Sequence, residues 1–124
     1  MPPKYKILVA DDSRDFVAIL CKLLERNGYE TLTASEGIRA IELAVKKKPD
    51  LILLDIMMPA GDGIRVLESL RSRPATKSLP IFVMTASIEP QLEEQVRQKG
   101  AQGTLFKPFD SDLLLAKIKS LLPG

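Results

Sequence analysis

Residues 7–12 are Ile-Leu-Val-Ala-Asp-Asp, and residues 51–55 repeat the pattern as Leu-Ile-Leu-Leu-Asp, an aliphatic run closed by an acid. Aliphatic runs of this length, separated by helical patterns, are typical of central strands in a parallel sheet. In open α/β sheets the ligand site lies beyond the carboxyl ends of the strands. The pattern therefore predicts that Asp11, Asp12 and Asp55 meet at one edge of the sheet.

Strand-like and helix-like patterns alternate five times along the chain. The expected strands are residues 6–10, 30–34, 51–54, 81–84 and 103–106. Five β-α units with right-handed crossovers give an α/β fold, a doubly wound (βα)5 three-layer sandwich around a parallel five-stranded sheet. The polar alternation of residues 30–34 suits an edge strand. The two strands that end in aspartate should lie side by side in the middle.

The five amphipathic stretches between these strands have clear start signals. We expect the helices to begin at Ser13, Ser35, Asp62-Gly63, Pro90, and Asp110 or Ser111. Their apolar stripes should face the sheet. The stripes include Ile38 in the second helix and Leu113 in the fifth.

Composition excludes several classes of protein. The 124 residues suit one domain, residues 1–124, and 18 basic against 16 acidic side chains give a charge too weak to indicate nucleic acid. No apolar stretch approaches the roughly 20 residues that span a membrane. One cysteine, Cys21, excludes an internal disulfide and fits a reducing compartment, so we expect a cytoplasmic protein. With no histidine, Ser–His and Cys–His catalytic pairs and histidine-ligated metals are excluded.

The predicted acidic edge has a chemistry of its own. Three carboxylates this close cannot all stay ionised unless a proton or a cation lies among them. All-oxygen ligation favours Mg²⁺, with Mn²⁺ as the alternative, over zinc. A helix-capping role would explain Asp11 or Asp12 alone, but it does not explain the pair together with Asp55. The first strand is also not followed by a glycine-rich phosphate loop.

Two further strand ends point to the same edge. Thr85 and then Ala86 follow the fourth strand, and Lys107, held by Pro108, follows the fifth. An ordinary loop is the alternative reading of Lys107-Pro108, whose peptide bond can be cis. Three carboxylates, a hydroxyl and an ammonium suit phosphoryl transfer to a carboxylate. Metal, lysine and hydroxyl would neutralise the equatorial oxygens during in-line attack.

Four motifs give the chain a family resemblance. They are Val9-Ala10-Asp11-Asp12-Ser13, Asp55-Ile56-Met57-Met58-Pro59 with Asp62-Gly63, Thr85-Ala86, and Lys107-Pro108-Phe109. In this order and spacing the chain resembles the receiver domain of two-component response regulators, and chemotaxis regulators in particular. The resemblance implies the flavodoxin-like strand order 2-1-3-4-5.

The resemblance also implies roles for the residues of the acidic edge. Asp55 would be the phosphoacceptor. Asp12 and Asp55 would bind Mg²⁺ directly, the backbone carbonyl of Met57 would be a third ligand, and Asp11 would act mainly through water.

Three other groups would contact the phosphoryl group. Lys107 would pair with one phosphoryl oxygen, the Thr85 hydroxyl would bond to another, and the Ala86 backbone N–H would complete the cradle.

By the same resemblance the phosphoryl donor is a phosphohistidine on a sensor histidine kinase or a histidine phosphotransfer protein. The domain would dephosphorylate itself and switch protein contacts through its fourth helix, fifth strand and fifth helix. Its target would be a downstream protein or a linked output domain absent from this chain. Such a protein is an autocatalytic phosphoacceptor and no conventional turnover enzyme, with no direct contact to nucleic acid or membrane.

The chain departs from the family at one switch position. Three residues before Lys107 the family has an aromatic residue, and this chain has Thr104. Phe106 lies two residues further on, on the same face of the strand. It either substitutes for that aromatic or, as we expect, is a packed core aromatic. In the family that the chain resembles, the residues two beyond the phosphoacceptor and two beyond the threonine often tune phosphoryl lifetime, and here they are Met57 and Ser87. Apolar Met57 cannot orient a water, which predicts slow self-hydrolysis.

Three alternatives stay open from the sequence. A pseudo-receiver would have the fold and act as an interaction module without phosphorylation. This alternative stays open because Thr104 stands where the family has an aromatic residue. A phosphatase with an aspartyl-phosphate intermediate would need a second aspartate at the place of Met57. A flavodoxin-like electron carrier is disfavoured by the acidic first loop.

Overall fold

The computed structural model describes residues 4–57, 63–86, 89–108 and 110–123. The strands are β1 (Lys6–Ala10), β2 (Glu30–Ala34), β3 (Leu51–Asp55), β4 (Ile81–Thr85) and β5 (Gly103–Phe106). The helices are α1 (Arg14–Arg26), α2 (Gly37–Lys47), α3 (Gly63–Ser72), α4 (Pro90–Gln98) and α5 (Ser111–Leu121). All five predicted strands and all five helices are present, and β3 and β4 each extend one residue beyond the expected range.

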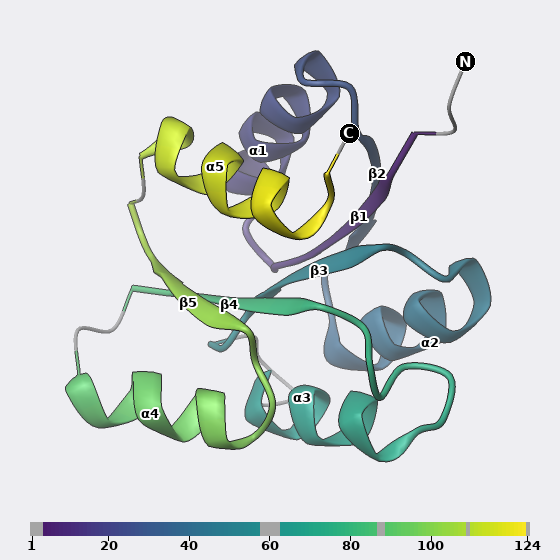
Figure 1. Cartoon of the computed structure of the whole chain (residues 1–124), viewed down its shortest axis with the longest axis vertical. Helices are drawn as coiled ribbons and strands as arrows, with labels where there is room; N and C mark the ends of the chain where they lie inside the picture. Colours follow the sequence, from purple (N-terminus) through teal and green to yellow (C-terminus); the bar gives the residue numbers. More distant parts are fainter. Residues whose placement is uncertain (1–3, 58–62, 87–88, 109, 124) are drawn as a thin grey trace.

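The strands form one parallel sheet in the order β2-β1-β3-β4-β5. Helices α1 and α5 cover one face and α2, α3 and α4 the other, which gives the three layers visible in Figure 1. The predicted fold class and strand order are therefore confirmed. The two aspartate-terminated strands, β1 and β3, pair directly, and the polar strand β2 lies at an edge as expected.

Each face of the sheet has its own hydrophobic cluster. Strand residues alternate between the faces, so Leu8 and Ile52 pack under α2, α3 and α4, whereas Ile7 and Leu53 pack under α1 and α5. Strands β1, β3 and β4 are buried on both faces, which explains why their sequences are continuously aliphatic.

Side-chain caps mark where two of the helices, α1 and α5, begin. The Ser13 hydroxyl accepts a hydrogen bond from the Phe16 N–H at 3.4 Å, and the Asp110 carboxylate caps α5. The prediction that Ser35 caps the second helix is wrong. The backbone stays extended through Glu36, so α2 starts one residue later and has no side-chain cap.

Two apolar residues expected to face the sheet point to solvent instead. Ile38 is 77% exposed and Leu113 is 52% exposed. Each follows or precedes a buried residue, Gly37 or Leu114, and is therefore turned about 100° around its helix from the buried stripe. An apolar side chain at the margin of a stripe does not by itself show which way it faces.

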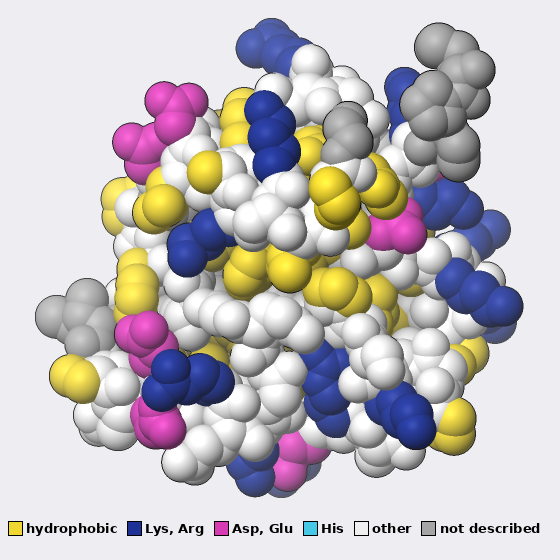
Figure 2. Space-filling view, in the orientation of Figure 1, with side chains coloured by type: hydrophobic (Ala, Val, Ile, Leu, Met, Phe, Trp, Pro, Cys, Tyr) yellow, Lys and Arg dark blue, Asp and Glu magenta, His cyan; other side chains and the backbone are white. Residues whose placement is uncertain are grey.

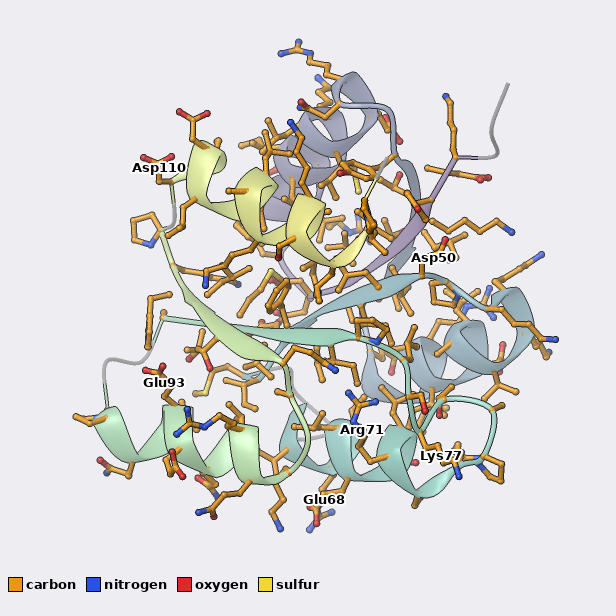
Figure 3. The ribbon with its side chains drawn as sticks, viewed as in Figure 1. Asp50, Glu68, Arg71, Lys77, Glu93 and Asp110 are labelled. Atoms are coloured by element: carbon orange, nitrogen blue, oxygen red, sulfur yellow. The ribbon has the colours of Figure 1, made fainter. Side chains whose placement is uncertain are left out.

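Arg71, in the last turn of α3, ties three segments together at the end of the sheet where β5 begins (Figure 3). Its guanidinium donates two hydrogen bonds to the Gly100 carbonyl, at 2.9 and 2.7 Å. It also donates to the carbonyls of Thr76 at 3.2 Å and Lys77 at 3.1 Å, and to Gln102 Oε1 at 3.2 Å. One side chain thus fixes α3, the loop after it, and the turn between α4 and β5.

The surface has both signs of charge. Figure 2 shows Lys and Arg side chains as well as Asp and Glu side chains on the visible face, in line with the small net charge of +2. Among the described residues no helix is both long enough and apolar enough to cross a bilayer.

Candidate functional site

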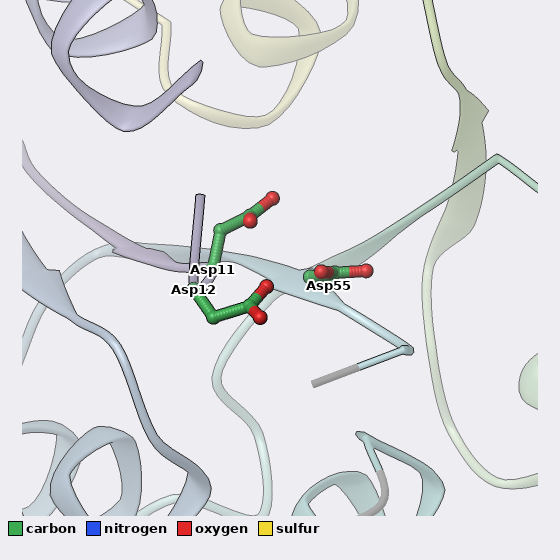
Figure 4. Close-up of side chains that lie close together, drawn as sticks. All are labelled: Asp11, Asp12 and Asp55. Atoms are coloured by element: carbon green, nitrogen blue, oxygen red, sulfur yellow. The ribbon is translucent and has the colours of Figure 1, made fainter. Parts of the chain in front are cut away.

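Three aspartates lie together at the carboxyl ends of β1 and β3 (Figure 4). Because Ala10 is opposite Leu54 in the sheet, the next residues, Asp11 and Asp55, leave the two strands side by side. Together with Asp12 they offer one carboxylate oxygen each, and these three oxygens all lie within 4.8 Å of one another. The convergence predicted from the two sequence runs is confirmed.

The three carboxylates differ in their surroundings. Asp11 and Asp55 are buried, with 2% and 5% of their surface exposed, whereas Asp12 is exposed. Asp11 Oδ1 accepts a hydrogen bond from the Ser13 N–H at 2.9 Å, and Asp55 Oδ1 accepts one from the Met57 N–H at 3.0 Å. The turn after each strand thus holds the carboxylate in place.

Lys107 brings a positive charge to this group. Its Nζ lies 2.5 Å from Asp11 Oδ2 and 3.8 Å from Asp55 Oδ2, and its side chain is 20% exposed. Burial raises the pKa of Asp55, and the charges of Asp11 and Asp12 raise it further. The Met57 N–H and Lys107 act in the opposite direction. One ammonium does not balance three carboxylates.

The donor set fits a hard divalent cation. It consists of oxygen atoms only, the carboxylates lie close together, and two negative charges remain after Lys107 is paired with one of the three. Mg²⁺ prefers such ligands and keeps several waters, and the exposed carboxylate of Asp12 leaves access for solvent. Among the described residues this is the group of acidic side chains that can hold such an ion.

Thr85 and Lys107 reach the same edge from β4 and β5. Thr85 is fully buried and follows Met84, which is opposite Asp55 in the sheet. The Lys107 N–H donates to the Thr85 carbonyl at 2.7 Å, and the Lys107–Pro108 peptide bond is cis. Ala86, directly after β4, is exposed.

The fold therefore brings the predicted site residues of β1, β3, β4 and β5 to one edge. Several residues of the predicted motifs lie outside the described part of the chain: Met58, Pro59, Asp62, Ser87 and Phe109.

The expectation that Phe106 is a packed core aromatic is wrong, because its side chain is 40% exposed. Phe106 is the last residue of the edge strand β5 and is opposite Thr85, whereas its neighbour Leu105 faces the cluster under α1 and α5. Thr104 is half-buried, and its hydroxyl oxygen has no hydrogen-bond partner among the described residues. The position at which the family has an aromatic residue therefore has neither an aromatic ring nor a bonded hydroxyl here.

Two features of the site were missed from the sequence. The Phe16 ring lies under the Lys107 ammonium, with 4.3 Å between Nζ and the ring centroid. A cavity of about 310 Å³ opens beside Asp11 and Asp12 and is bordered by Arg14 and Arg39. In the sequence Phe16 looks like one more apolar residue of α1, and its only signal is its place in the first turn after the aspartate pair.

Residues 7–119 of the chain match the family model described as Response regulator receiver domain. The alkaline phosphatase synthesis transcriptional regulatory protein PhoP of Bacillus subtilis is 40% identical over 117 residues, which cover 94% of this chain and 48% of that protein. This chain thus spans about half the length of that relative.

Two other similar proteins are close to this chain in length. Sporulation initiation phosphotransferase F of Bacillus subtilis is 33% identical over 118 residues, covering 95% of this chain and 94% of that protein. The solved structure of chemotaxis protein CheY4 from Vibrio cholerae superimposes with a TM-score of 0.90 at 30% identity, over 96% of this chain and 99% of that one.

Proposed function

Since this chain belongs to the response regulator receiver domain family, we propose that it is a phosphoaccepting receiver of a two-component or phosphorelay pathway. Asp55 is the acceptor. The observation that carries this assignment is the position of Asp55 at the end of β3, buried, within 3.8 Å of the Lys107 ammonium and beside two further carboxylates. Lys107 is closer to Asp11, but Asp55 is the carboxylate that also lies beside β4, opposite Met84 and next to Thr85.

The reaction forms one bond and breaks one. A carboxylate oxygen of Asp55 attacks phosphorus in line, the bond from phosphorus to the donor nitrogen or oxygen breaks, and the donor leaves with the electron pair. With a phosphohistidine donor the leaving group is the imidazole. With a small acyl phosphate it is a carboxylate.

The residues around Asp55 take separate parts in this reaction. A bound Mg²⁺ would supply positive charge to the phosphoryl oxygens, held by Asp12, Asp55 and the Met57 carbonyl directly and by Asp11 through water. Lys107 turns from Asp11 to a phosphoryl oxygen.

The remaining contacts come from β4 and the turn after it. The Thr85 hydroxyl and the Ala86 N–H donate to the other phosphoryl oxygens. The match to a relative named as a phosphotransferase supports this assignment.

The partners follow from the same proposal. The donor is a sensor histidine kinase or a histidine phosphotransfer protein, and the output is a downstream protein or a domain beyond this chain. Self-hydrolysis returns the domain to its resting state, so it is no turnover enzyme. The cytoplasmic location and the extent of the domain over residues 1–124 stay predictions.

Intact-mass spectrometry tests this function directly. After incubation with Mg²⁺ and acetyl phosphate, the protein should gain the mass of one phosphoryl group, and Asp55→Asn should not. Asp50→Asn is the matched control, since Asp50 accepts from the Lys6 N–H at 2.8 Å at the opposite end of the same strand (Figure 3). A folded wild-type protein that binds Mg²⁺ and takes up no phosphoryl group would contradict this proposal and favour the pseudo-receiver, an interaction module that does not depend on phosphorylation.

A further inference from the structure

We infer that Phe16 is a positioning residue for Lys107, and that its ring holds the ammonium in the site while the ammonium exchanges a carboxylate for a phosphoryl oxygen. This inference rests on the proposed function and adds a residue to it. The contact that suggests it is the 4.3 Å separation between Lys107 Nζ and the centroid of the Phe16 ring. A cation at this distance from a ring face is attracted by its quadrupole.

The ring and the ammonium belong to one closed circuit of contacts. Asp11 Oδ2 binds Lys107 Nζ at 2.5 Å, and Asp11 Oδ1 accepts from the Ser13 N–H at 2.9 Å. The Ser13 hydroxyl in turn accepts a hydrogen bond from the Phe16 N–H at 3.4 Å. The Phe16 ring contacts the Lys107 ammonium, which closes the set of contacts. The aspartate that holds the lysine thus also fixes the helix turn that carries the ring.

The ring provides Lys107 with an attraction that does not depend on which anion the ammonium binds. A lysine side chain has a flexible four-carbon stem, and its ammonium follows the nearest anion. At 2.5 Å from Asp11 and 3.8 Å from Asp55, it must move toward Asp55 to reach a phosphoryl group there. An attraction to a ring face depends little on the direction of the N–H bonds, so it persists as the ammonium turns. The aromatic contact therefore limits the volume that Nζ explores.

Partial burial strengthens this effect. The Lys107 side chain is 20% exposed, so water screens the contact less than on an open surface. Phe16 also packs against the hydrophobic cluster under α1 and α5, and this packing limits the movement of the ring. A purely structural role for Phe16 would need only this packing, and any apolar side chain of similar size would fulfil it.

Substitutions of Phe16 separate the two roles. Phe16→Leu keeps an apolar side chain and removes the ring face, whereas Phe16→Tyr keeps the ring. The full energy of such a contact corresponds to about 30-fold in rate, but the ring also contacts the ammonium in the resting protein, so only part of this energy changes the rate. We expect the rate of Asp55 phosphorylation by acetyl phosphate to fall by more than about 2-fold and less than about 30-fold in Phe16→Leu, and to recover in Phe16→Tyr. Leu23→Ala, which loosens the same helix and cluster away from Lys107, is the matched control and should keep the wild-type rate.

A graded series of fluorinated phenylalanines at position 16 tests the physical cause. Each ring fluorine weakens the negative face with little change of shape, so the logarithm of the rate should fall stepwise along the series. In the unphosphorylated protein, the ring current should shift the NMR signals of the Lys107 methylene next to Nζ upfield. That shift should vanish in Phe16→Leu and persist in Phe16→Tyr.

The outcomes are distinct. Wild-type rates in Phe16→Leu, equal losses in Phe16→Leu and Leu23→Ala, or a flat fluorine series overturn the positioning role. A wild-type protein that is never phosphorylated overturns the proposed function itself, and the inference falls with it.

Discussion

Replacing Gly63 by alanine should both destabilise the protein and disturb the segment that carries Asp55. Gly63 is the first residue of α3, and its N–H donates to the Ile56 carbonyl at 3.1 Å. A Cβ added there would lie 2.4 Å from Ile56 Cα, 2.7 Å from the Asp55 carbonyl oxygen and 2.8 Å from the Ile56 carbonyl carbon. All three atoms are backbone, so no side chain can rotate away to make room.

The magnitude follows from this overlap. Ordinary contacts of a Cβ begin near 3.4 Å, so α3 or residues 55–57 must move by about 1 Å. Overpacking of this kind costs about 1–3 kcal/mol, and rigid backbone neighbours place Gly63→Ala at the upper end. Alanine returns up to about 1 kcal/mol through its better helix propensity. We therefore expect a net loss of about 2 kcal/mol in the free energy of unfolding, or about 6–10 °C in Tm.

Gly28→Ala is the matched control for this experiment. Gly28 has a φ of +89°, and an added Cβ would meet nothing within 4 Å, so alanine there costs backbone strain of about 1–2 kcal/mol without a clash. Urea unfolding followed by circular dichroism should show comparable losses for both variants.

Only Gly63→Ala should slow phosphorylation of Asp55 under conditions where both proteins are fully folded. A Gly63→Ala variant as stable and as readily phosphorylated as the wild type would refute the close approach of α3 to the end of β3.

Four other predictions concern separate parts of the molecule. Arg71→Lys keeps the charge but cannot reproduce the fork of hydrogen bonds, and it should lower the free energy of unfolding in urea by about 2 kcal/mol; an unchanged midpoint would contradict this. Asp110→Ala removes a cap that accepts from two backbone N–H groups and should cost about 1 kcal/mol, with Asp110→Asn close to the wild type. Burial raises the pKa of the Cys21 thiol, so less thiolate is present at neutral pH; alkylation by iodoacetamide should be slower there than for free cysteine and should keep rising above the usual thiol range. Met57→Asn places an amide next to the acceptor and should shorten the phosphoryl lifetime, measured by loss of the mass adduct; an equal lifetime would exclude a role for this side chain.

The sequence was sufficient for the strands and for the acidic edge because both follow from local patterns. The runs that end at Asp11 and Asp55 are aliphatic at every position, as strands buried on both faces must be. The polar residues of β2 predicted an edge strand, because a strand with a face exposed to solvent is not aliphatic at every position. The strand order came from the family resemblance, since local pattern alone does not determine which strands pair.

Burial at the margins of elements and contacts between distant residues could not be predicted from the local sequence. Whether Phe106 is buried depends on how far α4 and the neighbouring strand end cover the edge of β5, and nothing in its own sequence shows this. Ile38 and Leu113 are apolar residues at the margins of helix stripes. The role of Phe16 depends on Lys107, which is far away along the chain and near only in the folded sheet. Such contacts are determined by topology and not by periodicity.

Arg71, on α3, donates two hydrogen bonds to the Gly100 carbonyl, so the carboxyl end of α4 is tied to α3. Gly100 follows the carboxyl end of α4, where Lys99 also pairs with Glu68 of α3 at 3.2 Å. The opposite end of α4 begins at Pro90. A helix of this length is about 13 Å long, so a rotation of about 10° at Gly100 moves the Pro90 end by about 2 Å. If α4 rotates, the contacts of Gly100 and Lys99 with α3 keep its carboxyl end in place, and the Pro90 end moves most.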